Sequence, residues 1–201
     1  LGEKVPGMTV NRYCASGLET IAIATAKIRA GMGECFIAGG VENMSQIPME
    51  GYKLALNYEV ADKHPDYIIG MGLTAEAVAK KYNISREAQD EFALRSHQLS
   101  SAARDRGFFA EEITPVSLTE ISVKNDKRTE TNFIVKEDEG IRKETTLEAL
   151  SALKPVFANH GTVTAGNASQ TSDGAGFVLV MSERMMNALG LQPVGRIIAC
   201  S

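Results

Sequence analysis

The first 40 residues alternate between extended and helical patterns, and this alternation restricts the fold more than any other feature of the sequence. Met8–Val10 is a short extended segment. Over Leu18–Ile28 apolar side chains recur at three- and four-residue spacing, which indicates a helix with one buried stripe, and Gly31 follows as its stop. Cys35–Ala38 is a short apolar run bounded by two glycines, typical of a buried parallel strand. Together they predict a βαβ unit with a right-handed crossover.

The middle of the chain, from residue 41 to about residue 160, is more highly charged, and its patterns predict helices joined by polar loops. We expect one helix over residues 74–81 and another that Ser85 caps, with its apolar face formed by Ala88, Phe92, Leu99 and Ala103. The charged stretch 121–139 predicts an exposed hairpin or loop, and residues 145–152 predict a short helix.

After Gly161 the composition changes back to small and apolar residues. Gly161–Ser169 is a loop of small residues, Phe177–Met181 reads as a buried strand, and Ser182 caps a short helix that ends near Gly190. We therefore predict an α/β fold in which a partial βαβ layer is interrupted by an inserted, mainly helical subdomain.

Composition excludes several classes of protein. The chain has 201 residues, of which 44% are hydrophobic and 23% charged, with a formal net charge of −4. These values fit a globular domain and give no reason to expect nucleic acid as a partner. No apolar run approaches the roughly 20 residues that span a bilayer, and no signal-peptide pattern is present, so we expect no membrane partner and a cytoplasmic location. Three widely spaced cysteines predict neither a disulfide framework nor a metal site.

Cys14 has the most chemically informative position in the chain, between the extended segment and the first helix. A thiol there faces free backbone N–H groups and the positive end of the helix dipole, which favour thiolate and can hold the oxygen of a thioester intermediate. Gly17 keeps the turn open for a substrate carbonyl. The alternative is a small buried cysteine that packs the first turn. Cys35 and Cys200 are expected in the core.

A cysteine nucleophile also needs a base, and the chain offers three histidines. His64 lies in a charged loop, and His97 is expected on the solvated face of its helix. His160 precedes the glycine-rich loop and could approach a site, although a plain turn histidine is the alternative. None forms a local constellation with Cys14. The residues by themselves therefore leave two classes open, a cysteine enzyme and a structural α/β domain.

Several segments resemble those of the thiolase family, in the family's order. Val10–Leu18, which reads VNRYCASGL, resembles the nucleophile motif. Further blocks are similar to other family segments: Ala38–Ser45, Met71–Glu76, Asp138–Arg142, Leu153–Phe157, Gly161–Ser169 and Ser172–Ala175. The resemblance implies a thiolase-like fold. Residues 1–40 would belong to the N-terminal domain, 41–160 to an inserted loop domain that binds coenzyme A, 161–192 to the return into the core, and 193–201 to the start of the C-terminal domain.

The resemblance also implies a reaction. A thiolase cleaves a 3-ketoacyl-CoA with free CoA, or condenses two acetyl-CoA, through an acyl-cysteine thioester that Cys14 would carry. Residues that would line the bound CoA are Met71, Arg142, Phe157, Ala165 and Ser169. Without the resemblance, Arg142 would read as a surface ion pair, Phe157 as core and Ser169 as a turn residue. The implied partners are acyl-CoA and CoA, as substrates with no further cofactor, and a second copy in a homodimer or homotetramer.

The sequence departs from the family pattern in two ways. Gly70 stands where some short-chain biosynthetic members carry a histidine, which favours a degradative 3-ketoacyl-CoA thiolase. The Asn-Glu-Ala-Phe-like segment, the Gly-His-Pro motif with the catalytic base, and the second catalytic cysteine are not found in this sequence. Because the chain also starts at Leu1 and ends in an extended pattern at Ile197–Ala199, we expect a piece of a longer protein. We expect no thiolase turnover from this chain alone.

Two other functions compete with this reading. The first is a non-catalytic, thiolase-like domain that at most binds CoA. The second is a relative of the β-ketoacyl synthases, which the blocks at Met71–Glu76 and Gly161–Ser169 disfavour. In each case a partial sheet would expose an edge and an apolar face, so we expect self-association.

Overall fold

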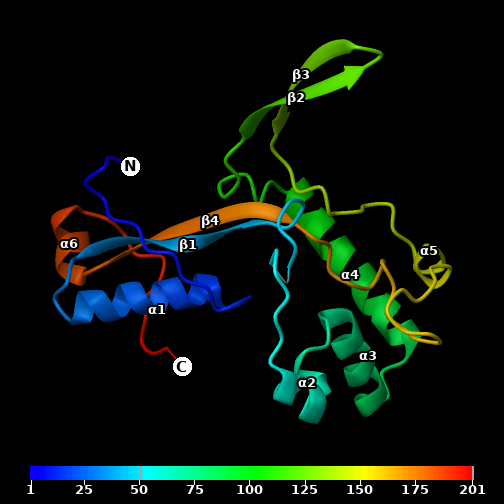
Figure 1. The fold of residues 1–201 in the computed structure, drawn as a ribbon. Coiled ribbons are helices and arrows are strands. Elements are labelled where there is room, and N and C mark those ends of the chain that lie inside the picture. The colour runs from blue at the N-terminus through cyan, green and yellow to red at the C-terminus, as the bar shows by residue number, and fades with distance from the viewer. Residues whose placement is uncertain (50, 201) are drawn as a thin grey trace. The chain divides into compact units, whose positions relative to one another are not determined.

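The computed structural model describes residues 1–49 and 51–200 (Figure 1). The chain divides into two compact units, one formed by residues 1–54 and 171–201 and the other by residues 55–170. The second unit covers most of the predicted insertion at 41–160. It also includes residues 161–170, which are hydrogen-bonded to its helices through Thr162 and Val163.

The first unit consists of a helix beside a two-stranded sheet, followed by a short helix. Helix α1 (Ser16–Arg29) packs against strand β1 (Cys35–Asn43), and β1 pairs with strand β4 (Asp173–Met181) (Figure 1). Helix α6 (Glu183–Ala188) follows β4. The predicted helix over Leu18–Ile28 is confirmed, and the left-handed Gly31 follows its end. Its buried residue is Ala24, whereas Leu18 of the predicted buried stripe is 74% exposed.

The pairing of β1 differs from the expected βαβ unit. Residues 8–10 form no strand, and β1 is antiparallel to β4 along its whole length instead of parallel to a preceding strand. An extended segment becomes a strand only through ladder hydrogen bonds, and the described ladder of β1 is with β4. Strand β1 also continues through Gly39 instead of stopping there. A β-carbon at Gly39 would collide with the carbonyl oxygen of Gly176, so the strands approach closely at this glycine.

The burial expected for the two strands is wrong over most of their length. Ala38 is buried, but Cys35 is exposed, and Phe177 and Leu179 are more than half exposed. Cys200 is exposed as well, contrary to expectation. The reason is that α1 packs on one face of a sheet that has only two strands, so side chains on the opposite face have no described layer over them.

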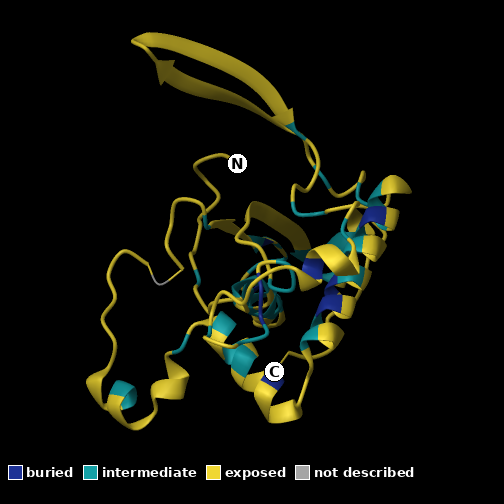
Figure 2. Cartoon of the chain, turned by 90° about the vertical axis from the view of Figure 1, so that its right-hand side faces the viewer, coloured by how far each residue is buried: buried dark blue, intermediate teal, exposed yellow. Residues whose placement is uncertain are grey.

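The second unit is mainly helical and carries one hairpin. Its elements are α2 (Tyr58–Lys63), the 3-10 turn η1 (Pro65–Tyr67), α3 (Met71–Tyr82), α4 (Arg86–Asp105), strands β2 (Val116–Lys124) and β3 (Lys127–Val135), and α5 (Leu147–Ser151). The predicted helices at 74–81 and 145–152 are confirmed, and the exposed hairpin spans residues 116–135 instead of the predicted stretch 121–139. Figure 2 shows the hairpin exposed along nearly its whole length.

Helix α4 begins where the sequence indicates, but it buries a different face. The Ser85 hydroxyl accepts a hydrogen bond from the Ala88 backbone N–H at 3.2 Å and caps the helix. The predicted apolar face is wrong, since Phe92 is 71% and Leu99 57% exposed. The buried residues are instead Asp90, Ala93 and Ser101. Small and polar side chains are buried here because α4 packs closely against α5 and is joined to other segments by polar contacts.

Candidate active site

The turn before α1 carries Cys14, and its backbone is strained at the preceding residue, Tyr13. Tyr13 has φ of 51°, in the left-handed region, which costs a residue with a β-carbon about 1–2 kcal/mol. The Tyr13 side chain is exposed, so no packing of that ring explains the strain. Strain of this kind persists only where surrounding contacts impose it, and it is concentrated at functional sites.

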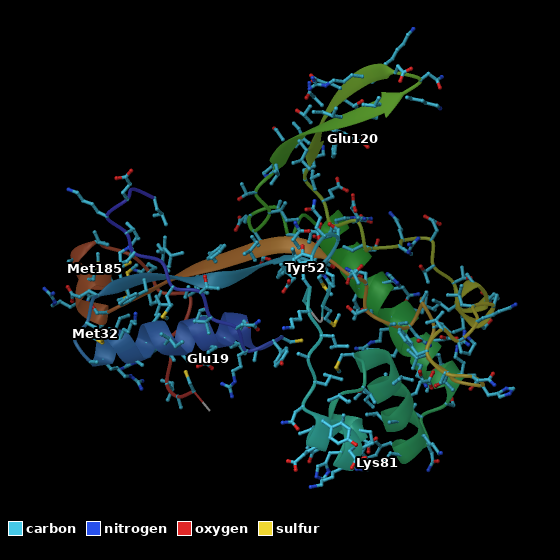
Figure 3. The ribbon with its side chains drawn as sticks, viewed as in Figure 1. Glu19, Met32, Tyr52, Lys81, Glu120 and Met185 are labelled. Carbon is cyan, nitrogen blue, oxygen red and sulfur yellow. The ribbon has the colours of Figure 1, made fainter. Side chains whose placement is uncertain are left out.

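Hydrogen bonds from both sides of the turn impose this conformation. The Asn11 Oδ1 accepts from the Tyr13 N–H at 2.9 Å. The Ser16 hydroxyl accepts from the Arg12 N–H at 2.8 Å and donates to the Tyr13 carbonyl at 2.6 Å. The Arg12 guanidinium also pairs with Glu19 of α1 at 2.5 Å; Figure 3 labels Glu19 on this helix. The turn is therefore tied to α1 by polar contacts at several points.

This turn leaves Cys14 exposed at the start of α1. The N-cap residue is Ala15, and no side chain among the described residues caps the helix. The N–H groups of Ala15 and Ser16 donate to the carbonyl oxygens of Arg12 and Tyr13 at 3.1 Å. Those of Gly17 and Leu18 have no acceptor among the described residues, so they could hold an oxyanion, and the helix dipole favours negative charge beside them. The alternative of a buried cysteine that only packs the first turn does not fit this exposure.

The residues predicted to bind CoA all belong to the second unit. Met71 is the first residue of α3, and its side chain is exposed. The ring of Phe157 lies so close to Gly72 that a β-carbon there would collide with it. Phe157 is still 44% exposed, so its ring is partly accessible to solvent beside the start of α3 and is not a core residue.

Arg142 lies in a segment that is fixed against α4. Its backbone N–H donates to His97 Nδ1 at 3.3 Å, and the neighbouring Lys143 pairs with Asp105 at 2.9 Å. The Arg142 side chain is exposed and forms no ion pair with any residue that the structure describes. A cation in this position is available to an anionic ligand, and the surface ion pair suggested as the alternative is not found.

The loop 161–169 carries the last two predicted CoA residues, Ala165 and Ser169, both exposed. Thr164, the residue before Ala165, is fully buried. The Glu76 carboxylate of α3 accepts hydrogen bonds from the backbone N–H groups of Thr162 and Val163. Burial opposes ionisation of Glu76, but these hydrogen bonds outweigh it and lower the pKa of this carboxyl.

The other end of this loop is held by a buried carboxylate that sequence reasoning missed. Asp90 of α4 is 1% exposed, pairs with Arg86 at 2.7 Å and accepts from the Asn167 side-chain amide at 2.9 Å. The Asn167 Oδ1 in turn accepts from the Thr164 N–H at 2.7 Å. Glu76 and Asn167 lie within segments that resemble thiolase blocks, so their presence in those blocks was the available signal. Their mutual proximity depends on tertiary structure.

The three histidines also belong to the second unit. His64 stacks on Tyr67 with ring centroids 5.2 Å apart, and His160 has φ of 56° in an exposed turn. His97 is half-buried and accepts the hydrogen bond from Arg142, so the expectation of a fully solvated side chain is wrong. None of the three lies in the turn that carries Cys14.

Within 1–49 and 51–200, no group of three or more His, Cys, Asp or Glu side chains is arranged to hold a metal ion. In the same ranges, no helix is both long enough and apolar enough to cross a membrane.

Comparisons with known proteins give matches that cover residues of both units. The family model "Thiolase, N-terminal domain" matches residues 1–184. The 3-ketoacyl-CoA thiolase of Bacillus subtilis is 51% identical over 191 residues, which cover 94% of this chain and 49% of that protein. The acetyl-CoA acetyltransferase of Escherichia coli is 42% identical, over 98% of this chain and 51% of that protein. The crystal structure of human mitochondrial 3-ketoacyl-CoA thiolase matches with a TM-score of 0.77 and 35% identity, over 96% of this chain and 50% of that one.

The chain belongs to the thiolase family, because the family model matches nearly all of it. The predicted α/β, thiolase-like fold class is confirmed by the structural match. The chain spans about half the length of the relatives and the solved structure that it matches.

Proposed function

We propose that this chain supplies the acyl-accepting cysteine and a CoA-binding surface for an acyltransferase of the thiolase type. The observation that carries the proposal is the strained turn at Tyr13, which displays the Cys14 thiol at the uncapped start of α1. The names of the bacterial relatives support an acyl-CoA as the substrate class.

In the proposed reaction the Cys14 thiolate attacks the C3 carbonyl carbon of a 3-ketoacyl-CoA. A carbon–sulfur bond forms, and the oxygen takes up the electron pair near the first-turn N–H groups of α1. When the carbonyl re-forms, the C2–C3 bond breaks, and the acetyl-CoA enolate leaves and takes up a proton. Free CoA then attacks the acyl thioester as its thiolate and releases acyl-CoA and the cysteine. Coenzyme A is thus a substrate, and no separate cofactor is proposed.

Binding of CoA is proposed for the second unit. Arg142 would contact the nucleotide end, Ser169 and Ala165 would lie along the pantetheine arm, and Met71 and Phe157 would shape the tunnel. Their exposure leaves all five accessible to a ligand. Gly70 and the name of the Bacillus relative favour the degradative direction, as in fatty-acid β-oxidation.

The proposal is tested by mapping acyl groups after incubation of the chain with acetoacetyl-CoA or acetyl-CoA. We expect a stable acyl adduct on the peptide that contains Cys14, and none after Cys14→Ser. Cys35→Ser is the matched control, since Cys35 is also exposed but lies in β1, away from a helix start. Acylation of Cys35 at the same rate as Cys14 would contradict the proposed role of the turn.

The second candidate function is a non-catalytic domain that only binds CoA. It is favoured by the position of all five predicted CoA residues in one compact unit, 55–170. Calorimetric titration with CoA, together with the acylation assay, separates the two candidates. Saturable binding without any acyl adduct on Cys14 would favour the binding domain, whereas an adduct would favour the acyltransferase.

We also propose self-association as a homodimer or homotetramer, supported by the uncovered apolar face of the β1–β4 sheet. The proposed location is the cytoplasm, as expected for bacterial acyl-CoA metabolism, whereas the human structure is that of a mitochondrial thiolase. Cell fractionation would distinguish these locations.

A further inference from the structure

We propose that Glu76 is a positioning residue for coenzyme A. Its carboxylate sets the conformation of the loop 162–169, and through this loop it sets the affinity for the pantetheine arm. The inference rests on the proposed function, because family resemblance is what assigns Ala165 and Ser169 to bound CoA.

Three donors of the loop converge on the one carboxylate. The Thr162 N–H lies 2.9 and 3.0 Å from the two Glu76 oxygens, and the Val163 N–H lies 2.8 Å from Oε1. The Thr162 hydroxyl donates to Oε2 at 3.2 Å. Hydrogen bonds to an ionised group are about twice as strong as neutral ones. Consecutive backbone N–H groups of the loop are therefore held by a side chain of α3.

The backbone beside the carboxylate has the shape that this contact requires. A β-carbon at Gly161 would collide with Glu76 Oε1, so glycine allows the carboxylate to reach the two following N–H groups. The φ of Gly161 is not in the left-handed region, so alanine fits the backbone conformation there. The substitution Gly161→Ala can therefore displace the Glu76 carboxylate while the negative charge of Glu76 is kept.

The loop has other anchors besides Glu76: the Val163 carbonyl accepts from the Val156 N–H at 3.1 Å, and the Asn167 amide donates to Asp90 at 2.9 Å. Thr164 is fully buried and its N–H is held by Asn167, while Ala165 and Ser169 are exposed. Without the Glu76 carboxylate, the N–H groups of Thr162 and Val163 lose their acceptor, and the loop 162–169 samples more conformations. Binding then has to order the loop as well as contact the ligand, which weakens affinity without altering a ligand contact.

The test compares Glu76→Gln, Gly161→Ala and the double variant by CoA calorimetry, well below their unfolding temperatures. The Gln side chain keeps the size but turns an amide donor toward backbone donors, so we expect the Kd for CoA to rise roughly tenfold. Gly161→Ala should raise it in the same direction. The double variant should bind within about twofold of the weaker single variant, because both remove the same hydrogen bonds.

The matched control is Glu87→Gln, the same chemical change at the exposed start of α4. This carboxylate interacts with its own N–H and with Ser85 and makes no described contact with the loop. It should destabilise the helix start and leave the Kd for CoA unchanged. A residue that only stabilises the fold would lower the melting temperature in Glu76→Gln without changing CoA affinity, and that result would overturn the proposal.

Amide hydrogen exchange provides a readout that does not depend on CoA. In wild type the Thr162 and Val163 amides should be protected, and Glu76→Gln should expose both while α4 amides stay protected. A wild-type chain that binds no CoA would contradict the proposed function, and the exchange data would still decide whether Glu76 orders the loop. Unchanged protection in Glu76→Gln would overturn the inference even if wild type binds CoA.

Discussion

At the residue scale, the candidate site depends on Cys14 and on the backbone conformation of Tyr13, and only the position of Cys14 can be predicted from the sequence. The position of Cys14 before an amphipathic helix can be read from sequence, because helix starts carry local signals. The left-handed Tyr13 cannot, because tyrosine has no preference for that conformation and the hydrogen bonds of Asn11 and Ser16 impose it. The sequence thus indicated the candidate nucleophile but not the backbone strain in the turn that exposes it.

At the same scale, the lowered pKa of Glu76 predicts how the stability of the fold depends on pH. Burial opposes ionisation of Glu76, but the hydrogen bonds from Val163 and Thr162 hold its folded-state pKa below that of an ordinary glutamate. The ionised form therefore stabilises the fold above the ordinary pKa, and this stabilisation is lost as pH falls through the lowered pKa. We expect wild type to melt at a higher temperature than Glu76→Gln at pH 7. The difference should shrink steadily below about pH 4.5.

Thr162→Val is the control for this measurement, by thermal unfolding between pH 7 and pH 3. It removes the hydroxyl donor and keeps both backbone donors, so most of the pH dependence should persist. Parallel loss of stability in wild type and Glu76→Gln over the whole range would contradict the assigned role of the carboxylate.

At the element scale, α4 shows why apolar periodicity chose the wrong face. Phe92 and Leu99 give the stronger stripe in the sequence, yet the helix packs through Ala93, Ser101 and a buried carboxylate, Asp90. Arg86 pairs with Asp90 and also donates to the carbonyl oxygens of α5 and the residues after it. A polar network of this kind has no periodic signature, because its members come from separate segments.

The Asp90 network predicts a large stability effect from a single substitution. Asp90→Ala removes a buried carboxylate, so the Arg86 guanidinium loses its ion-pair partner and the Asn167 amide loses one of its two acceptors. We therefore expect a loss of about 3 kcal/mol in the free energy of unfolding. Glu91→Ala, at the adjacent exposed position of α4, should change it by less than about 0.5 kcal/mol. Urea unfolding measures both, and equal midpoints for the two variants would contradict a structural role for Asp90.

At the scale of the whole molecule, the first unit joins segments that are far apart in the chain. Strand β1 pairs with β4, from Cys35 opposite Met181 to Asn43 opposite Asp173, and the second unit lies between them in sequence. Side chains on the face away from α1 form an exposed apolar face: Ile37, Val41, Phe177 and Leu179. Exposed apolar faces of this kind mark interaction surfaces, and we propose that a second copy of the chain covers this one.

The exposed apolar face of the β1–β4 sheet predicts that the chain self-associates. Leu179→Glu places a charge at the centre of the face and should shift the chain toward monomer in sedimentation velocity, because a buried unpaired charge is unfavourable. Leu99→Glu is the matched control, since Leu99 on α4 has a similar exposure of 57% against 60% for Leu179. A wild-type chain that is monomeric throughout, or equal effects of both variants, would contradict this role for the face.

The sequence by itself determined the family, the helix starts at Ser85 and Ser182, a short helix within residues 145–152, and the exposure of the charged stretch 121–139. Each of these rests on signals between residues that are close in the chain, such as caps, periodicity and short motifs. Only the tertiary structure decided which strand pairs with β1, which face of α4 is buried, and that Glu76 holds the loop 162–169. Those outcomes depend on contacts between distant segments, and a local pattern specifies that a side chain needs a partner without specifying which one.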